Sequence, residues 1–156
     1  MGGPAIIDGN LHEECDNFLE TVFTLGEITY NTSEQYFQCQ KATNEDEFNL
    51  ILNSGGPMAA WAKGNKITLR KDWEAVKVQI MYEGNLAKFV QNPILAEKLC
   101  NSTGQAKFTG STPFWNKWNG LIMERIRAEL RGSEDDLKKA GEIEQLMNEY
   151  SESKTK

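Results

Sequence analysis

Residues 32–41 have the sequence TSEQYFQCQK, and this stretch decides the centre of the fold. Thr32 is a residue type that caps helices, and Gln35 follows it at the spacing of a capping box. The pattern therefore predicts a helix that begins after Thr32 and runs to about Ala42. The bulky side chains of this helix point in several directions, which leaves little of its circumference for water. We expect it to be the central helix of the domain.

Two charged residues of this helix share one face. Glu34 and Lys41 lie seven residues apart, which corresponds to two turns, roughly 20° of rotation and about 10 Å. Gln38 lies between them. In a cleft partly shielded from water, a carboxylate and an amine have shifted pKa values, as an acid or base and an amine nucleophile require. Glutamate and lysine at this spacing are also common on solvated faces, so the pair alone does not decide.

The segments before this helix are predicted to be a flexible arm and a hairpin. Residues 1–11 are rich in glycine and weakly patterned, which indicates a flexible N-terminal arm. Residues 17–30 place β-branched and aromatic residues on both sides of Gly26, a pattern that predicts a short β-hairpin.

The segments after this helix are mostly helical in pattern. Asp72 is expected to cap the longest helix, which would end before Pro93. Ser133 and Asp136 offer another capping box for a final amphipathic helix, whose apolar stripe would pack on the domain or on a partner. The further predicted elements are helices over residues 45–53, 57–63, 93–101 and 119–131, and an edge strand over residues 105–109.

These elements predict an α+β fold that is predominantly α-helical, in a single compact domain with a short β-hairpin and a central catalytic helix. A chain of 156 residues is long enough to bury a core on its own. We expect the domain itself over residues 12–131, and a C-terminal amphipathic helix with a charged tail over residues 132–156.

Charge argues against a protein that coats nucleic acid. The net charge is −6, and non-specific binding of nucleic acid depends on neutralising phosphates. Residues 63–77, however, contain five basic and two acidic side chains. This local excess suits a phosphate-bearing small ligand, and Lys66, Arg70 and Lys77 are candidates to bind a diphosphate. A solvated face with scattered lysines explains the charge equally well.

The counts of cysteine and histidine limit the chemistry. Three distant cysteines favour buried thiols over a disulfide framework or a zinc site, and His12 is the single histidine. We therefore expect no metal and no cofactor, and a site built from carboxylates, lysines and aromatic residues. No apolar run is long enough to span a bilayer, and the first residues lack the features of a secretory signal. We expect an intracellular protein, cytoplasmic or nuclear, without a membrane partner.

Several ordered blocks resemble the NADAR (YbiA-like) family. Residues 32–41 are similar to its T/S-x-E-x-Y-x-Q-x-x-K pattern, and Asp16-Asn17-Phe18 resembles its S-N-F segment. Residues 57–64 match the helix that follows, residues 69–77 resemble the L-R-x-x-W-x-x-V-K block, and residues 87–93 match the A-K-F-x-Q-N-P block. The resemblance covers roughly residues 14–131, and the ordered blocks together are more specific than any one of them.

The resemblance implies an N-glycosidic hydrolase that acts on NAD-like or ADP-ribose-like substrates. It makes Glu34 the catalytic carboxylate and Lys41 its partner. The substrate-binding residues that we expect are Asn17, Phe18, Gln38, Lys66, Arg70, Trp73, Lys77, Trp115 and Asn116. Four tryptophans provide more aromatic surface than a core of this size needs, and a planar base would stack on part of it.

Two departures from the family pattern concern the late tryptophan, Trp115. The family commonly has an acidic residue three positions earlier, where this chain has Thr112. The W-G-x-G turn that usually follows is replaced by the shorter sequence WNKWNG at residues 115–120. A scheme with two carboxylates therefore lacks its second acid, and the chemistry is expected to depend more on Lys41.

The activity we expect is hydrolysis of the bond between ADP-ribose and guanine in ADP-ribosylated DNA or RNA, which the protein would contact through the modified base. Glu34 would act as acid or base, and Lys41 as a possible Schiff-base nucleophile. Two alternatives stay open: a reader module that binds ADP-ribose or NAD without turnover, and an N-glycosidase of the ribosylamine phosphates of the riboflavin pathway. A monomer is favoured.

Overall fold

Helix α1 (Ser33–Cys39) lies at the centre of the molecule, where all seven of its residues are buried. We describe a computed structural model that covers residues 2–155. The Thr32 side chain accepts a hydrogen bond from the Gln35 N–H at 3.0 Å, which confirms the predicted cap. The helix ends at Cys39, earlier than predicted, because a tighter turn carries the Lys41 N–H to the Gln38 carbonyl at 3.2 Å.

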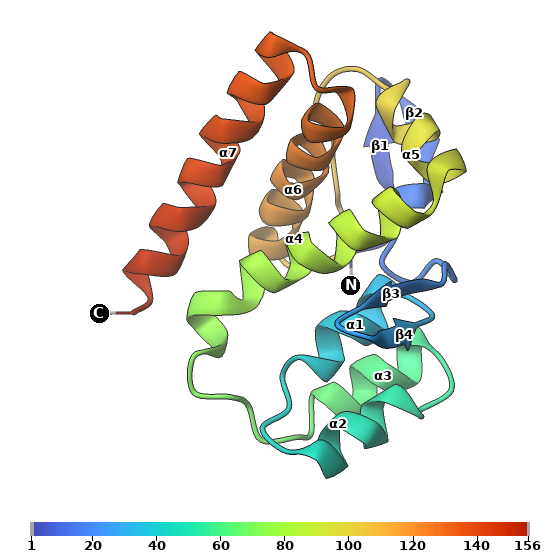
Figure 1. Cartoon of the computed structure of the whole chain (residues 1–156), viewed down its shortest axis with the longest axis vertical. Helices are drawn as coiled ribbons and strands as arrows, with labels where there is room; N and C mark the ends of the chain where they lie inside the picture. The colour runs from blue at the N-terminus through green and yellow to red at the C-terminus, as the bar shows by residue number, and fades with distance from the viewer. Residues whose placement is uncertain (1, 156) are drawn as a thin grey trace.

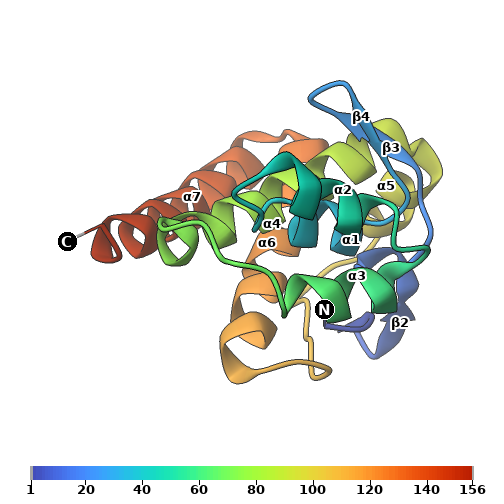
Figure 2. The same cartoon turned by 90° about the horizontal axis from the view of Figure 1, so that it is seen from below.

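The other helices surround α1 in two groups on either side of the long helix α4 (Figure 1). One group contacts α1 directly, and the other packs α6 and α7 against α4. Figure 2 shows α7 at the opposite end of the molecule from the hairpin of β3 (Phe23–Leu25) and β4 (Ile28–Tyr30). The helices are α2 (Glu45–Leu52), α3 (Pro57–Gly64), α4 (Trp73–Gln91), α5 (Pro93–Cys100), α6 (Pro113–Arg131) and α7 (Glu134–Ser153).

The predicted hairpin is confirmed as the antiparallel pair β3 (Phe23–Leu25) and β4 (Ile28–Tyr30). The turn between the strands consists of Gly26 and Glu27, both with positive φ, at 62° and 68°. Two successive residues of this kind give a turn whose twist matches that of the strands. With the helices, the hairpin confirms the α+β class and the helical majority.

The prediction of a flexible arm over residues 1–11 is wrong for residues 2–11, which are built into the fold, and residue 1 lies outside the described residues. Strands β1 (Ala5–Ile7) and β2 (Asn10–His12) form a second antiparallel hairpin, with the short 3-10 helix η1 (Glu13–Cys15) after it. The Ala5 and Ile7 side chains are fully buried, and they alternate with the exposed Ile6. This period of two is the signature of a strand, which the glycine content obscured.

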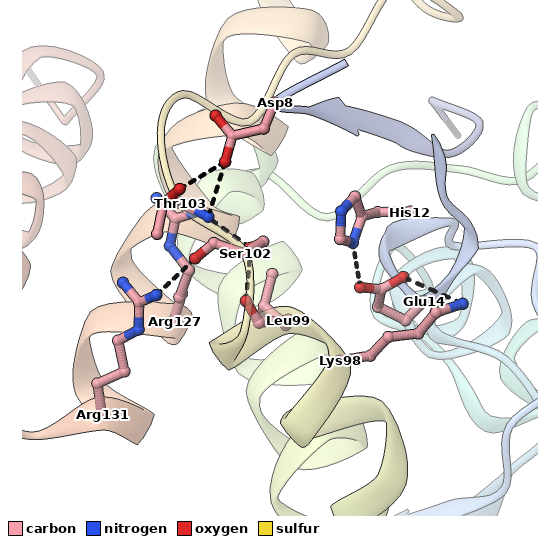
Figure 3. A network of polar contacts seen from close by, with 9 residues as sticks. All are labelled: Asp8, His12, Glu14, Lys98, Leu99, Ser102, Thr103, Arg127 and Arg131. Carbon is pink, nitrogen blue, oxygen red and sulfur yellow. Dashed lines mark hydrogen bonds and ion pairs between the residues drawn. The ribbon is translucent and has the colours of Figure 1, made fainter. Parts of the chain in front are cut away.

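Polar side chains from later segments hold this hairpin in place (Figure 3). Asp8 accepts hydrogen bonds from the Thr103 side chain at 2.5 Å and from its N–H at 3.2 Å. The adjoining loop is fixed to α6, because Arg127 donates to Ser102 at 3.1 Å and Arg131 to the Cys100 carbonyl at 2.9 Å. The hairpin and α6 are thus joined through residues 100–104.

The predicted edge strand over residues 105–109 is present only as isolated bridges. Ile6 and Lys107 exchange backbone hydrogen bonds of 2.9 Å and 3.0 Å, and Gly2 is bridged to Gly110. The segment contacts the N-terminal hairpin at single points and does not extend into a ladder.

One helix start and one helix cap differ from prediction. Helix α6 begins at Pro113 rather than near residue 119, because Thr112 caps it by accepting from the Trp115 N–H at 3.3 Å. Asp72 occupies the position before α4, but its side chain does not cap the helix. It pairs instead with Arg70, at 2.6 Å to Nε and 3.0 Å to Nη2.

Helix α7 begins after Ser133, which caps it as predicted. Its stripe of Ala140, Ile143 and Met147 is buried against the domain, where α7 contacts α6 and α4. Tyr150 donates from its hydroxyl to the Glu74 carbonyl at 2.8 Å. Within residues 2–155, no helix has the length and the apolar character that crossing a membrane requires.

Candidate functional site

Glu34 lies in the first turn of α1 with no exposed surface. Its backbone N–H donates to the Asn17 carbonyl at 3.0 Å, and its carboxylate Oε2 accepts from Gln38 Nε2 at 2.5 Å. A negative charge near the start of a helix interacts favourably with the free N–H groups there. The first turn thus holds a carboxylate in one orientation inside the protein.

Asn17 fixes the loop of residues 16–18 to this turn. Its side-chain oxygen accepts from Ser33 Oγ at 2.7 Å and from Asn85 Nδ2 of α4 at 3.0 Å. Lys88, also on α4 and fully buried, donates from Nζ to the Asp16 carbonyl at 3.3 Å. The loop of residues 16–18, which contacts Glu34, is therefore held by side chains of both α1 and α4.

Helix α3 passes directly over Gln38. A Cβ atom built on Gly64 would lie 2.0 Å from Gln38 Oε1, which no side chain could tolerate without displacing Gln38. Glycine at this position allows α3 to approach α1. One turn earlier on α3 lies Trp61, a residue that sequence reasoning did not assign to the site.

Lys41 follows the end of α1 and is buried, with 9% of its surface exposed. Its Nζ lies 5.7 Å from the ring centroids of both Phe37 and Trp73. Burial lowers the pKa of the Lys41 amine to about 8, and the positive charge of Lys77 acts in the same direction. Roughly a tenth of such an amine is neutral at pH 7, far more than for a solvated lysine.

Both tryptophans that were predicted to line a pocket contact Phe37, the aromatic neighbour of Lys41. Trp73 and Trp115 pack against Phe37, with ring centroids 5.0 Å and 5.3 Å away. Lys77 is held near them, since its Nζ lies 2.7 Å from Glu74 and 4.4 Å from the centroid of the Phe114 ring. Lys41 thus has apolar walls and a cationic neighbour.

The remaining predicted residues differ in position. Arg70 is hydrogen-bonded to the end of α1. Its backbone N–H donates to the Lys41 carbonyl at 3.0 Å, and its guanidinium donates to the Gln40 carbonyl at 3.5 Å. Lys66 is exposed in the loop after α3. Asn116 binds the Ser111 backbone at 3.0 Å and 3.2 Å, and it lines a separate hollow between residues 105–109 and α6.

A cavity of about 390 Å³ lies beside the loop that contacts Glu34. Phe18 and Asp16 line one side of it, and Met58 and Trp61 of α3 line another. Backbone from Gly2, Gly3 and Gly110 also contributes to its walls. Phe18 was predicted to bind ligand. The sequence showed Trp61 only as one of four tryptophans. It could not show that Trp61 is partly exposed while the other three are buried, because this exposure depends on how α3 packs.

Other nucleophiles and metal-binding groups contribute little to this region. Burial raises the pKa of the Cys15 and Cys39 thiols to about 12, which keeps them protonated. Among the described residues, no three histidine, cysteine or acidic side chains are grouped so that they could hold a metal ion. A buried carboxylate, a buried amine of lowered pKa and an aromatic cavity are the groups that this arrangement offers for chemistry.

A family model for the NADAR domain matches residues 10–133. The chain is 40% identical over 125 residues to the N-glycosidase YbiA of Escherichia coli (strain K12), a match that covers 71% of this chain and 78% of that protein. An N-glycosidase of Nostoc punctiforme is 32% identical over 131 residues, which cover 74% and 83% of the two chains.

A solved structure is similar as well. The NMR structure of the Escherichia coli protein YbiA superimposes with a TM-score of 0.63 and 26% sequence identity. The alignment covers 76% of this chain and 78% of that one.

Proposed function

The chain belongs to the NADAR domain family, whose relatives named above are N-glycosidases, and from this premise we propose that it releases ADP-ribose from guanine in ADP-ribosylated DNA or RNA. The bond to be cleaved joins C1 of the ribose to a guanine nitrogen. The protein would contact the nucleic acid through the modified base and would need no cofactor.

The observation that carries this proposal is the presence of a buried carboxylate and a buried amine on α1 and the turn after it. Helix α1 and the turn after it hold a fully buried carboxylate, Glu34, and a buried amine, Lys41, whose pKa is lowered to about 8. The loop fixed to Glu34 also lines an aromatic cavity. Acid or base catalysis and amine nucleophilicity both require groups with environments of this kind.

In the proposed reaction, Glu34 protonates the ring oxygen of the ribose, and the bond between this oxygen and C1 breaks. The neutral Lys41 amine then forms a bond to C1, and the bond from C1 to the guanine nitrogen breaks as that nitrogen takes up the proton that the newly bonded lysine nitrogen gives up. Water finally adds to C1 of the resulting protonated imine and returns a proton to the Glu34 carboxylate. The bond from C1 to the lysine nitrogen then breaks, which restores the neutral lysine, and the released aldehyde closes to ADP-ribose. Apolar walls around Lys41 favour the neutral amine that this sequence needs.

The phosphates of the substrate are assigned to Lys66, Arg70 and Lys77. Arg70 and Lys77 are paired with Asp72 and Glu74, so they would have to share their charge with the diphosphate or exchange partners on binding. Lys66 is exposed. These three residues belong to the basic segment of residues 63–77, which runs from the end of α3 to the start of α4.

The test is incubation of the protein with an oligonucleotide that carries ADP-ribosylated guanine. Wild type should release free ADP-ribose, and Glu34→Gln should lose at least about 100-fold in rate while keeping its fold. Borohydride added during turnover should link ADP-ribose to Lys41 in wild type and not in Lys41→Ala. If Lys41→Ala remains active and wild type gives no trapped adduct, the Schiff-base step is wrong.

Two other functions are separated by the same assay. A reader module would bind the modified oligonucleotide without releasing ADP-ribose. An N-glycosidase of riboflavin-pathway ribosylamine phosphates would turn over those compounds faster than the oligonucleotide, and the N-glycosidase relatives are equally compatible with it. Comparison of kcat/KM on the two substrate kinds therefore decides between the proposals.

A further inference from the structure

Side chains from two segments of the chain line the cavity beside Phe18. One wall is the loop of residues 16–18, and the other is α3, which contributes Met58 and Trp61. Trp73, Trp115 and Trp118 are only 5–8% exposed, whereas Trp61 is partly exposed at the cavity. Aromatic side chains placed this way stack on the faces of planar heterocycles, and they do so with little regard for which base is present.

Asp16 adds a polar group to this aromatic cavity. One of its carboxylate oxygens, Oδ1, accepts the Phe18 N–H at 2.9 Å, which fixes the side chain in the loop. Asp16 is only partly buried, and an ionised carboxylate has about four acceptor positions and no donor. The positions that remain can accept N–H groups from a ligand in the cavity.

Each of the two segments that line the cavity also contacts Glu34 or its hydrogen-bond partner Gln38. Between Asp16 and Phe18, the Asn17 carbonyl accepts the Glu34 N–H at 3.0 Å. On the other side, α3 lies against Gln38 at Gly64, and Gln38 donates to the Glu34 carboxylate. The loop and the helix that line the cavity are therefore the same two segments that contact α1 at Glu34 and Gln38.

The edges of the bases differ in the groups that they offer to Asp16. Guanine presents two adjacent donors on its Watson–Crick edge, the N1–H and the 2-amino group. Hypoxanthine keeps only the N1–H. Adenine places a lone pair at N1, which an acceptor-only carboxylate repels. A carboxylate at this position distinguishes the three bases by charge-assisted hydrogen bonds.

We propose that the cavity formed by Asp16, Phe18, Met58 and Trp61 is the base-binding subsite, and that Asp16 selects guanine over adenine. This inference rests on the proposed function, because it places the guanine that the reaction releases. Stacking on the aromatic side chains supplies affinity, and the carboxylate supplies the choice of base.

The test is titration of the full chain with 5′-GMP, 5′-IMP and 5′-AMP, followed by NMR signals of the Phe18 backbone amide and the Trp61 indole. Wild type should bind GMP most tightly, IMP less tightly and AMP weakest. Asp16→Asn keeps the oxygen that accepts the Phe18 N–H, but it replaces the other oxygen with a donor. GMP affinity should fall roughly 10- to 100-fold, and the preference should shift towards AMP.

A second pair of variants separates stacking from edge recognition. Trp61→Ala should weaken all three nucleotides by a similar factor, on the order of 10-fold or more, and Trp61→Phe should restore most of the loss. The proposal is overturned if the GMP to AMP ratio is the same in wild type and Asp16→Asn, or if the nucleotides shift signals elsewhere and leave Phe18 and Trp61 unchanged.

Failure of the subsite and failure of the proposed function give different results. If wild type releases ADP-ribose but Asp16→Asn changes neither the nucleotide preference nor KM, the subsite alone is wrong. If GMP binding depends on Asp16 but no ADP-ribose is released from the modified oligonucleotide, the subsite stands and the hydrolase is wrong.

Discussion

Gln38 donates a hydrogen bond of 2.5 Å from its side-chain amide to the Glu34 carboxylate one helical turn away, where both side chains are buried. This hydrogen bond restricts the Glu34 side chain to one rotamer. Gln38 in turn has little freedom, because Gly64 leaves just enough space for it. The orientation of the proposed acid thus depends on a residue of another helix that has no side chain.

Gly64→Ala should therefore lower activity through Gln38. The added methyl group would meet Gln38 Oε1 at 2.0 Å, so the amide must move and release the Glu34 carboxylate. We expect kcat for ADP-ribose release to fall about 10-fold or more, a loss of roughly 1.4 kcal/mol in transition-state stabilisation. The matched control is Gly141→Ala in the exposed part of α7, where a Cβ meets nothing within 4 Å. Equal activities of the two variants would contradict the role of Gln38.

The charge of Lys77 should set the pH range in which Lys41 reacts. Burial and then Lys77 lower the pKa of Lys41 to about 8, and the neutral amine is the reactive form, so kcat should rise with pH through about 8. Lys77→Met removes the charge and keeps an apolar stem against Phe114, which should raise the Lys41 pKa and move the rise in kcat to higher pH. Lys77→Arg should retain the wild-type profile at saturating substrate. Coincident profiles for all three proteins would exclude the influence of Lys77.

Lys88 should make stability depend on pH. Burial lowers the pKa of Lys88 to about 8, below its ordinary value of 10.5, and Lys41 is lowered similarly. Between these values the unfolded chain binds more protons at the lysines, so their contribution to the free energy of unfolding should increase with pH above about 8. The raised pKa of the Cys15 and Cys39 thiols acts in the opposite direction, so the share of Lys88 is read from the difference between wild type and a variant. From pH 8 to 9.5 each lysine should contribute on the order of 1–2 kcal/mol.

Lys88→Met should remove its share of this increase, as urea unfolding at several pH values would show. The range stops below pH 10, because burial raises the pKa of Tyr30 and Tyr36 to about 12 and their titration in the unfolded chain has the opposite effect. Identical slopes in wild type and Lys88→Met would show that Lys88 keeps an ordinary pKa.

Thr112 should contribute to stability as the cap of α6. Its side chain accepts the Trp115 N–H at 3.3 Å, so Thr112→Ala should lower the free energy of unfolding by about 1 kcal/mol. Thr112→Asp supplies an equivalent cap and the acidic residue of the family pattern, and it should unfold like wild type. Thermal or urea unfolding of the two variants measures the difference, and equal losses would show that capping is not the role of this position.

Features that depend on neighbouring residues could be predicted from the sequence. The cap at Thr32 and the turn at Gly26 are determined within a few residues, and both are confirmed. The family resemblance implied that Trp73 and Trp115 line a pocket, which stays a prediction. Their common contact with Phe37 could not be derived from spacing, because it requires α1, α4 and α6 to meet.

Features that depend on distant partners were missed. The N-terminal hairpin is stabilised by Thr103, which is 95 residues away from Asp8, and no local pattern indicates such a contact. The exposure of Trp61 depends on the packing of α3, and the place of Asp16 at the cavity depends on the loop held by Asn85 and Lys88. A composition rich in glycine suggested disorder where tertiary contacts impose order.

The long reach of these contacts has a consequence for synthesis of the protein in a cell. Asp16, Asn17 and Phe18 leave the ribosome before the α4 side chains that hold their loop, which follow 68 and 72 residues later. The hairpin of β1 and β2 waits longer still for Thr103. A nascent chain that ends before α4 therefore carries α1 without a finished cavity, and incomplete chains of this kind expose apolar surface that is prone to aggregate. The cavity beside Phe18 is completed only once the segment around Gly110 has been made.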